Sequence, residues 1–273
     1  MNKKKMLIIA AAVSAALLLG GIFLLTKDTV RQRSTEREMK PYMPSPKILS
    51  TLDDISTPEF ATEAVGGITA TSEVPTAPSS ELPSELRQQL IDTAAELNNA
   101  YPDSLGWLYI PDTVISYPIM QSDDNEFYLS HASDGSRLKA GSLFLDYRCE
   151  NRFMNPINII YGHNMRNGSM FAQVTNYTND GFFEAHRYGW LATPDTVYRI
   201  DFFSCTIADS SDSLYDGSTP IAEWIPHIVE KSVVTREMTF LDEDRFISLS
   251  TCSYEFRNAR TVLTGKLVDT IGG

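Results

Sequence analysis

Apolar residues from position 106 onward recur in short runs rather than with the spacing of helices. Glycine, proline, asparagine and aspartate separate the runs, which is typical of short β-strands joined by turns. Eight runs are predicted to be strands, at residues 106–110, 114–120, 141–145, 157–161, 188–193, 197–207, 246–252 and 260–268. Eight short strands favour a closed or nearly closed barrel, so we predict a mostly β fold with peripheral helices.

A helix is predicted ahead of these strands. Leu86, Leu90, Ala94 and Leu97 recur at helical spacing, and Tyr101 with the proline after it ends the pattern. Further helical pieces are predicted at residues 125–129, 169–174, 181–185 and 221–231. The last of these is the longest, and it falls between the sixth and seventh strands.

The N-terminal residues carry a membrane signal. Residues 6–25 are apolar and uncharged, which is long enough to cross a bilayer as a helix, and three lysines precede them. A cleaved signal peptide is the competing interpretation, but residues 17–25 stay apolar where a polar cleavage region is expected. An uncleaved transmembrane signal anchor is therefore favoured. The positive charges on the two sides of the span do not decide its orientation.

The segment between the anchor and the first strand-rich region has the composition of a linker. Residues 41–80 are rich in proline, serine, threonine and alanine and show no periodic apolar pattern. We therefore predict a flexible tether over residues 26–80 and a folded domain over residues 81–273. About 50 residues of such a chain have a root-mean-square reach of about 40 Å.

The charge of the chain limits its partners. Residues 1–40 hold eight Lys and Arg against three Asp and Glu, a balance of +5, so the total of −12 leaves −17 for residues 41–273. A body this acidic argues against nucleic acid as a partner, because phosphate contacts need a basic face. The basic residues after the apolar span are better suited to an anionic lipid surface.

Three cysteines are too few for a disulfide framework in a domain of this size. Cys205 lies in a predicted strand and is expected in the core. Cys149 lies in a polar stretch, and a bridge between these two remains open. Cys252 is left to be explained.

Cys252 and Arg260 flank the turn of a predicted hairpin. The strands at 246–252 and 260–268 are joined by seven residues, so these two side chains can face each other across the turn. A thiol beside a permanent cation is a candidate nucleophile next to a group that favours a thiolate or an oxyanion. A small apolar cysteine and a solvated arginine are the plainer interpretation, and the hairpin alone favours it.

Cysteine chemistry also needs an imidazole nearby. His163 follows the buried-looking strand 157–161 with only a glycine between them, which places it at a strand end where a barrel presents side chains. His131 in a polar loop and His186 at a helix end have ordinary structural explanations, and His227 lies within a predicted helix with no partner visible from the sequence. No acidic orienter follows from spacing, so the electrophilic role falls to Arg260, with the backbone N–H of Ser253 as the expected second oxyanion donor.

The residues around these three positions resemble the active-site signature of sortases, the cysteine transpeptidases of Gram-positive surfaces. The matching segments are YGHNM at 161–165, LSTCSYEF at 249–256 and NAR at 258–260, in the family's order of His, Cys and Arg. The stretch 106–129 and the helix at 221–231 are similar to class B sortases in particular. The resemblance covers about residues 98–268 and implies the sortase β-barrel.

The resemblance also implies an activity. Cys252 would attack the threonine carbonyl of an LPxTG-like C-terminal sorting motif on a surface protein, and an amine of a cell-wall peptide would resolve the thioacyl enzyme. His163 would be the general acid and base, and Arg260 would hold the substrate and the oxyanion. Substrate-binding positions implied by the family or expected beside the nucleophile are Asn125, Leu129, Tyr161, Ser250 and Ser253. No cofactor or metal is expected.

The family further implies a cytoplasmic N-terminus at residues 1–5 and a single-pass anchor in the cell membrane, with the catalytic domain outside the cell. Within the family, a pilin-polymerising sortase that uses a pilin lysine as acceptor is the main alternative. A cysteine hydrolase that releases peptide to water is a second alternative. An inactive barrel that only binds peptide is the third.

Overall fold

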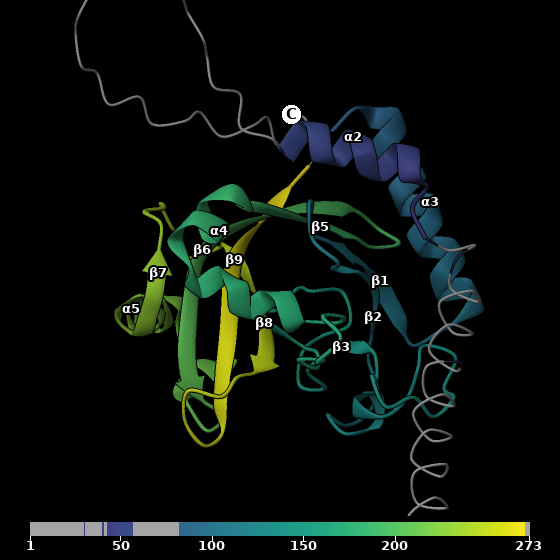
Figure 1. Ribbon diagram of the computed structural model, residues 1–273. Coiled ribbons are helices and arrows are strands. Elements are labelled where there is room, and N and C mark those ends of the chain that lie inside the picture. The colour runs from purple at the N-terminus through teal and green to yellow at the C-terminus, as the bar shows by residue number, and fades with distance from the viewer. Residues whose placement is uncertain (1–29, 31–39, 41–42, 57–81, 271–273) are drawn as a thin grey trace, which may run out of the picture.

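The computed structural model describes residues 30, 40, 43–56 and 82–270 (Figure 1). The predicted anchor at residues 6–25 and part of the predicted tether lie outside these residues. Within the described part of the chain, no helix is both long and apolar enough to cross a membrane.

The strands form one sheet that closes on itself. Their order is β5-β1-β2-β3-β4-β8-β9-β6-β7, and β5 also pairs with β6. The strands are β1 (Ser104–Tyr109), β2 (Ser116–Met120), β3 (Leu143–Leu145), β4 (Ile157–Tyr161), β5 (Tyr188–Ala192), β6 (Val197–Asp209), β7 (Ser232–Thr235), β8 (Arg245–Cys252) and β9 (Ala259–Asp269). The β5–β6 pairing closes an eight-stranded barrel and leaves β7 outside it, so the predicted fold class is confirmed.

All eight predicted strands are present, with ends that shift by a few residues. The additional strand, β7, pairs with β6 over a few residues directly after a helix. A run as short as this carries too few residues to show alternation, so the sequence did not reveal it.

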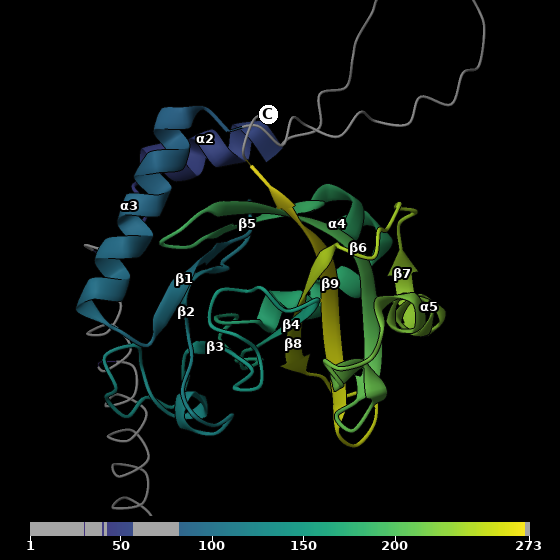
Figure 2. The ribbon, with the colours of Figure 1, turned by 180° about the vertical axis from the view of Figure 1, so that it is seen from behind.

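The helices lie outside the barrel. They are α2 (Pro46–Ser56), α3 (Ser84–Ala100), α4 (Asp180–Ala185) and α5 (Ile221–Lys231), with 3₁₀ turns η2 (Phe127–Leu129), η3 (Ala172–Thr178) and η4 (Ser213–Tyr215). Figures 1 and 2 show α3 beside β1 and α5 on the opposite side, next to β6 and β7. Pro226 lies inside α5 without ending it. Trp224 and Ile228, on either side of the proline, are buried against the sheet, and this packing helps to hold the helix in place.

The barrel is filled by aliphatic and aromatic side chains. Leu108, Ile160, Leu249 and Leu263 come from four different strands and are fully buried in one cluster. Most strands that contribute to this interior also have buried residues on their outer face, and helices cover much of the barrel. Strands buried on both faces read as nearly continuous apolar runs, as the sequence has them at 157–161 and 246–252.

Helix α2 corrects part of the predicted tether. Residues 46–56 were expected to be flexible, but they form a helix whose Leu52 is only 1% exposed. The helix is held by hydrogen bonds from Tyr109 to Asp53 and from Trp190 Nε1 to Ser56 Oγ, the latter 2.9 Å long. This segment has apolar residues at helical spacing, but the surrounding sequence is rich in proline, serine and threonine. The prediction of a flexible tether followed that composition and not the spacing.

Candidate active site

The ends of two neighbouring parallel strands bring the candidate residues together. Strands β4 and β8 run parallel, with Tyr161 opposite Ser250. Their carboxyl ends therefore meet at the same edge of the barrel. His163 follows β4 after one glycine, and Cys252 is the last residue of β8, so both side chains belong to this edge.

Cys252 and Arg260 lie directly opposite each other in the hairpin of β8 and β9, as predicted. The neighbouring N–H of Ser253 donates to the carbonyl of Ala259 at 3.0 Å, which makes Cys252 and Arg260 a non-hydrogen-bonded pair. Side chains in such pairs are the closer ones in an antiparallel sheet. Both are partly exposed, and the Arg260 guanidinium donates through Nη1 to the Ala259 carbonyl at 3.0 Å.

The expected second oxyanion donor is occupied in this structure. Because the N–H of Ser253 continues the hairpin ladder to Ala259, it points across the sheet and is engaged there. The Ser253 side chain is buried, and this residue does not line the cavity described below. The prediction of a free donor failed because the ladder extends one residue beyond the strand. Arg260 is the donor that remains beside Cys252.

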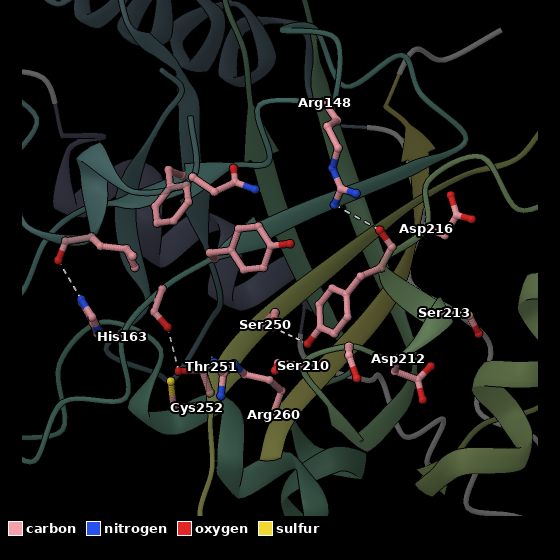
Figure 3. Close-up of a pocket in the computed structure, with 17 residues that line it drawn as sticks. Arg148, His163, Ser210, Asp212, Ser213, Asp216, Ser250, Thr251, Cys252 and Arg260 are labelled. Carbon is pink, nitrogen blue, oxygen red and sulfur yellow. Dashed lines mark hydrogen bonds between the residues drawn. The ribbon is translucent and has the colours of Figure 1, made fainter. Parts of the chain in front are cut away.

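The His163 side chain is hydrogen-bonded to the backbone of the 3₁₀ turn η2. Its Nε2 lies 2.8 Å from the carbonyl oxygen of Leu129. A carbonyl only accepts, so Nε2 carries a proton here and Nδ1 is the nitrogen left for proton transfer. Figure 3 shows this bond leading away from Cys252. A role of His163 in proton transfer at the sulfur would therefore use Nδ1, or would require the ring to leave Leu129.

Backbone contacts fix the segment between the two strand ends. The N–H of Gly162 donates to the Ser250 carbonyl at 3.2 Å, and Thr251 Oγ1 donates to the Gly162 carbonyl at 2.7 Å. Asn164 Nδ2 donates to the Cys252 carbonyl at 2.9 Å. A Cβ at position 162 would lie 2.5 Å from a methyl group of Leu143 and 2.6 Å from the ring of buried Phe171, so a larger residue would force these core side chains to shift.

A cavity of about 750 Å³ opens at this edge of the barrel (Figure 3). Its lining consists of Asn125, Leu129, Phe144, Arg148, Tyr161, Gly162, His163, Ser210, Ser211, Asp212, Ser213, Tyr215, Asp216, Ser250, Thr251, Cys252 and Arg260. The three candidate catalytic residues and four of the five predicted substrate-binding positions are among them. The volume is suited to a short peptide segment or a ligand of drug size.

Residues 210–216 form a wall of the cavity that sequence reasoning missed. They include Asp212 and Tyr215, and they lie between the strand predicted at 197–207 and the helix predicted at 221–231, where no site residue was predicted. Nothing in their spacing points to a site. Their position follows from the pairing of β6 with β9, which places the end of β6 beside Arg260.

Tyr215 of this wall and Tyr161 at the end of β4 give the cavity a neutral, hydroxyl-bearing surface. The rings of Tyr161 and Tyr215 stack with centroids 6.3 Å apart, and the hydroxyl groups of Tyr215 and Ser250 are 2.8 Å apart. Burial raises the pKa of Tyr215 to about 12. Burial likewise raises the pKa of Tyr161, whose hydroxyl donates to Asp146 at 2.9 Å. Both rings therefore stay neutral at physiological pH.

Asp212 ties the missed wall to helix α5. Its carboxylate accepts a hydrogen bond from His227 Nε2 at 2.6 Å, and it also binds Lys231. Burial opposes its ionisation, but hydrogen bonds from His227 and Lys231 outweigh this and lower the pKa of Asp212 to about 2. His227, for which the sequence showed no partner, is thus one of the residues that hold the wall in place.

The other two cysteines have no place in this chemistry. All three cysteines are free thiols, so the bridge between Cys149 and Cys205 that the sequence left open is not formed. Burial raises the pKa of both side chains, for Cys205 to about 12. A buried neutral thiol is a poor nucleophile. Cys252, at the cavity with an imidazole and a guanidinium, is the candidate for acyl transfer.

Comparisons with known proteins agree with this geometry. The chain is 37% identical to sortase B of Listeria monocytogenes over 190 residues, which are 67% of this chain and 76% of the relative. A Streptococcus pyogenes class B sortase involved in pilus biogenesis superimposes with a TM-score of 0.60 at 31% identity, covering 64% of this chain and 97% of that one.

Sortase B of Clostridium perfringens has the same fold, with a TM-score of 0.59 at 32% identity over 64% of this chain and 99% of that one. No family model matches the sequence. The Listeria relative is similar enough, over enough of its length, to settle the family. The chain belongs to the class B sortases, which are cysteine transpeptidases.

Proposed function

We propose that this sortase cleaves an LPxTG-like C-terminal sorting motif through a thioacyl intermediate on Cys252 and transfers the surface protein to an amine of a cell-wall peptide. The observation that carries the proposal is the meeting of Cys252, Arg260 and His163 at one cavity of a class B sortase. A nucleophile, a proton carrier and a fixed cation are the groups that acyl transfer needs.

In the first step, His163 takes the proton of the Cys252 thiol, and the sulfur attacks the carbonyl carbon of the motif's threonine. Negative charge develops on the carbonyl oxygen, and Arg260, opposite Cys252 in the hairpin, donates hydrogen bonds to it. The threonine–glycine C–N bond then breaks. His163 gives a proton to the departing amine, and the thioester remains on the enzyme.

In the second step, the acceptor amine attacks the thioester carbon and His163 takes a proton from it. The C–S bond breaks and His163 returns the proton to the sulfur, so the thiol is restored and a new amide joins the surface protein to the acceptor. Transfer rather than hydrolysis requires that water be disfavoured at the thioester. The stacked rings of Tyr161 and Tyr215 line the cavity and give that side of it an uncharged aromatic surface, with both hydroxyl groups already hydrogen-bonded within the protein.

The N-terminal span gives the proposed location. Residues 6–25 act as a single-pass anchor in the cell membrane, with residues 1–5 in the cytoplasm and the catalytic domain outside the cell. The apolar length of the span and the family membership support this arrangement.

A pilin lysine is the second candidate acceptor. The observation in its favour is the Streptococcus pyogenes relative, which is described as involved in pilus biogenesis. The ε-amine of a lysine and the amine of a wall peptide present the same nucleophile to the thioester. The acceptor is therefore decided by contacts outside the cavity.

The proposal is tested by following the products from an LPxTG-like peptide with and without an added amine. We expect the transfer product to increase with amine concentration at the expense of the hydrolysed acid, for a wall-type peptide amine more than for a pilin-type lysine peptide. Cys252→Ala is the control. Hydrolysis alone with every amine would replace the transpeptidase by a cysteine hydrolase.

A further inference from the structure

Arg148 is a permanent cation in the cavity wall for which the chemistry above has no use. It follows β3 by three residues and lines the same cavity as Cys252. Figure 3 shows it on the side of the cavity opposite Cys252 and His163, with Ser250 between them. Half of its side chain, 50%, is exposed.

A buried carboxylate holds this arginine in one orientation. Asp146, whose side chain is 1% exposed, accepts from Arg148 Nε at 2.9 Å and from Arg148 Nη2 at 2.7 Å. The same carboxylate accepts from the backbone N–H of Arg148 at 2.9 Å and from the Tyr161 hydroxyl at 2.9 Å. A paired fork of this kind fixes a guanidinium far better than a single hydrogen bond does.

One edge of the fixed guanidinium is left for a ligand. Arg148 Nη2 also donates to the Tyr215 carbonyl at 3.2 Å, so Nε and Nη2 are both engaged. Within the described part of the chain, Nη1 has no hydrogen-bond partner. Since Arg148 lines the cavity and is half exposed, this edge can reach a molecule that lies there.

The reaction dictates which part of the substrate can reach that side. After the first step the acyl part of the substrate is bonded to Cys252, while the amine side has left. Residues that precede the motif's threonine must therefore lie along the cavity, away from the sulfur. Arg148 lies across the cavity from Cys252, with Ser250 between them (Figure 3), so a peptide that follows the cavity away from the sulfur comes within its reach.

The carboxylates around Arg148 favour a ligand oxygen that carries no charge. Asp146 already balances the charge of Arg148, and Asp216, which Arg148 influences electrostatically, also lines the cavity. An additional carboxylate would meet these two carboxylates. A backbone carbonyl or a side-chain amide offers an acceptor oxygen without that repulsion.

We propose that Arg148 is a substrate-binding residue that donates a hydrogen bond to a neutral carbonyl or amide oxygen of the residues preceding the motif's threonine. This inference rests on the proposed function. It adds a contact on the upstream side of the substrate, which makes recognition depend on residues that never react.

The test compares two peptides on the full-length protein: one with several residues before the motif's threonine, and one that begins immediately before it. Thioester formation on Cys252 is followed by mass for wild type, Arg148→Gln, Arg148→Lys and Arg152→Gln. Arg152 is the matched control, since it is 69% exposed, follows the same strand and does not line the cavity.

We expect Arg148→Gln to lower kcat/KM for the long peptide by about tenfold to a hundredfold, the range for one hydrogen bond to a charged group. The loss should lie mainly in KM and should shrink to little for the short peptide. Arg148→Lys should recover only part of the activity, because lysine lacks the fork. Arg152→Gln should behave as wild type.

Equal losses for the long and the short peptide would overturn the inference, because Arg148 would then act only on the shape of the site. An unchanged kcat/KM would overturn it as well. Melting temperatures of the variants identify a folding defect, and Asp146→Asn, which leaves Arg148 in place but loosens its fork, should reproduce the length-dependent loss more weakly. If wild type forms no thioester with either peptide, the proposed function itself fails.

Discussion

The geometry of a single residue pair gives this protein its sharpest chemical feature. Cys252 and Arg260 oppose each other as a non-hydrogen-bonded pair, and the N–H expected to help Arg260 is engaged with Ala259. In the proposed mechanism, stabilisation of the oxyanion would therefore depend on the arginine more heavily than the sequence suggested. The imidazole of His163 is held by a hydrogen bond to the Leu129 carbonyl and has no acidic partner among the described residues.

Replacing Arg260 should slow acylation with little effect on folding. Removal of one oxyanion donor typically costs about 2.7–4 kcal/mol of barrier, so Arg260→Gln should lower the acylation rate about a hundredfold to a thousandfold. Arg257→Gln is the control, because Arg257 is exposed in the same hairpin loop. Rates are measured by quenched mass spectrometry and folding by thermal melts. Near-normal acylation in Arg260→Gln would remove the proposed role.

The candidate residues could be found from the sequence because strand ends are visible in it. His163 after a glycine-terminated strand and Cys252 opposite Arg260 both follow from strand periodicity and loop length. The engagement of Ser253 depends on where the ladder stops, which periodicity does not give. Arg148 and Asp212 lie in irregular segments, where the spacing of residues holds no information about direction.

At the scale of elements, the connection after β6 is held by ion pairs rather than by apolar packing alone. Asp212, 8% exposed, accepts from His227 and Lys231 of α5 and so fixes the wall that carries Tyr215. Leu214 and Trp224 pack beneath it in one buried cluster. The wall of the cavity is therefore attached to α5 by the Asp212 carboxylate together with this packing and a hydrogen bond from Trp224 Nε1 to the Leu214 carbonyl.

This attachment predicts a pH dependence of stability. Asp212 has a pKa of about 2 in the folded protein, below the ordinary value near 4, so its ionised form stabilises the fold above about pH 4. That contribution is lost as the pH falls towards 2. Asp212→Asn should therefore lower the urea midpoint at pH 6, and the difference from wild type should shrink as the pH falls from about 5 to 2.

The exposed Asp242 provides the comparison for this measurement. Asp242→Asn should leave the urea midpoint close to wild type at every pH. A difference between wild type and Asp212→Asn that stays constant down to pH 2 would show that the carboxylate does not stabilise the wall through its charge.

Helix α2 should stabilise the domain although it lies away from the cavity. Leu52 is buried in the same cluster as Trp107 and Trp190. Leu52→Ala should therefore lower the free energy of unfolding by up to about 5 kcal/mol, and by less if the helix detaches before the barrel unfolds. Ser50→Ala, at an exposed position of α2, is the control. Denaturant unfolding gives the stability, and the acylation rate should not change. Equal stability of both variants would contradict the docked helix.

The molecule as a whole could be predicted in its topology more fully than in its boundaries. Eight runs with turn signals gave the strands of the barrel, and the extra strand β7 and the docked helix α2 were the omissions. Both are short pieces whose stability comes from neighbours distant in sequence. β7 is too short to show periodicity, and the helical spacing in α2 was outweighed by the surrounding proline, serine and threonine.

The acidic body and the basic N-terminal segment give the chain a divided charge. With −17 on residues 41–273 and +5 on residues 1–40, an anionic membrane would attract the N-terminal segment and repel the domain. This charge division suits the proposed arrangement, in which the domain works on substrates that arrive outside the membrane.

The central claim is that Cys252 carries the acyl group of a sorting-motif substrate. It is tested most directly by the intact mass of the protein after brief incubation with an LPxTG-like peptide. We expect a mass increase equal to the acyl part of the peptide, located on Cys252 by peptide mapping, removed by added amine and absent from Cys252→Ala. An unmodified protein while the peptide is cleaved, or an adduct that persists in Cys252→Ala, would contradict the account.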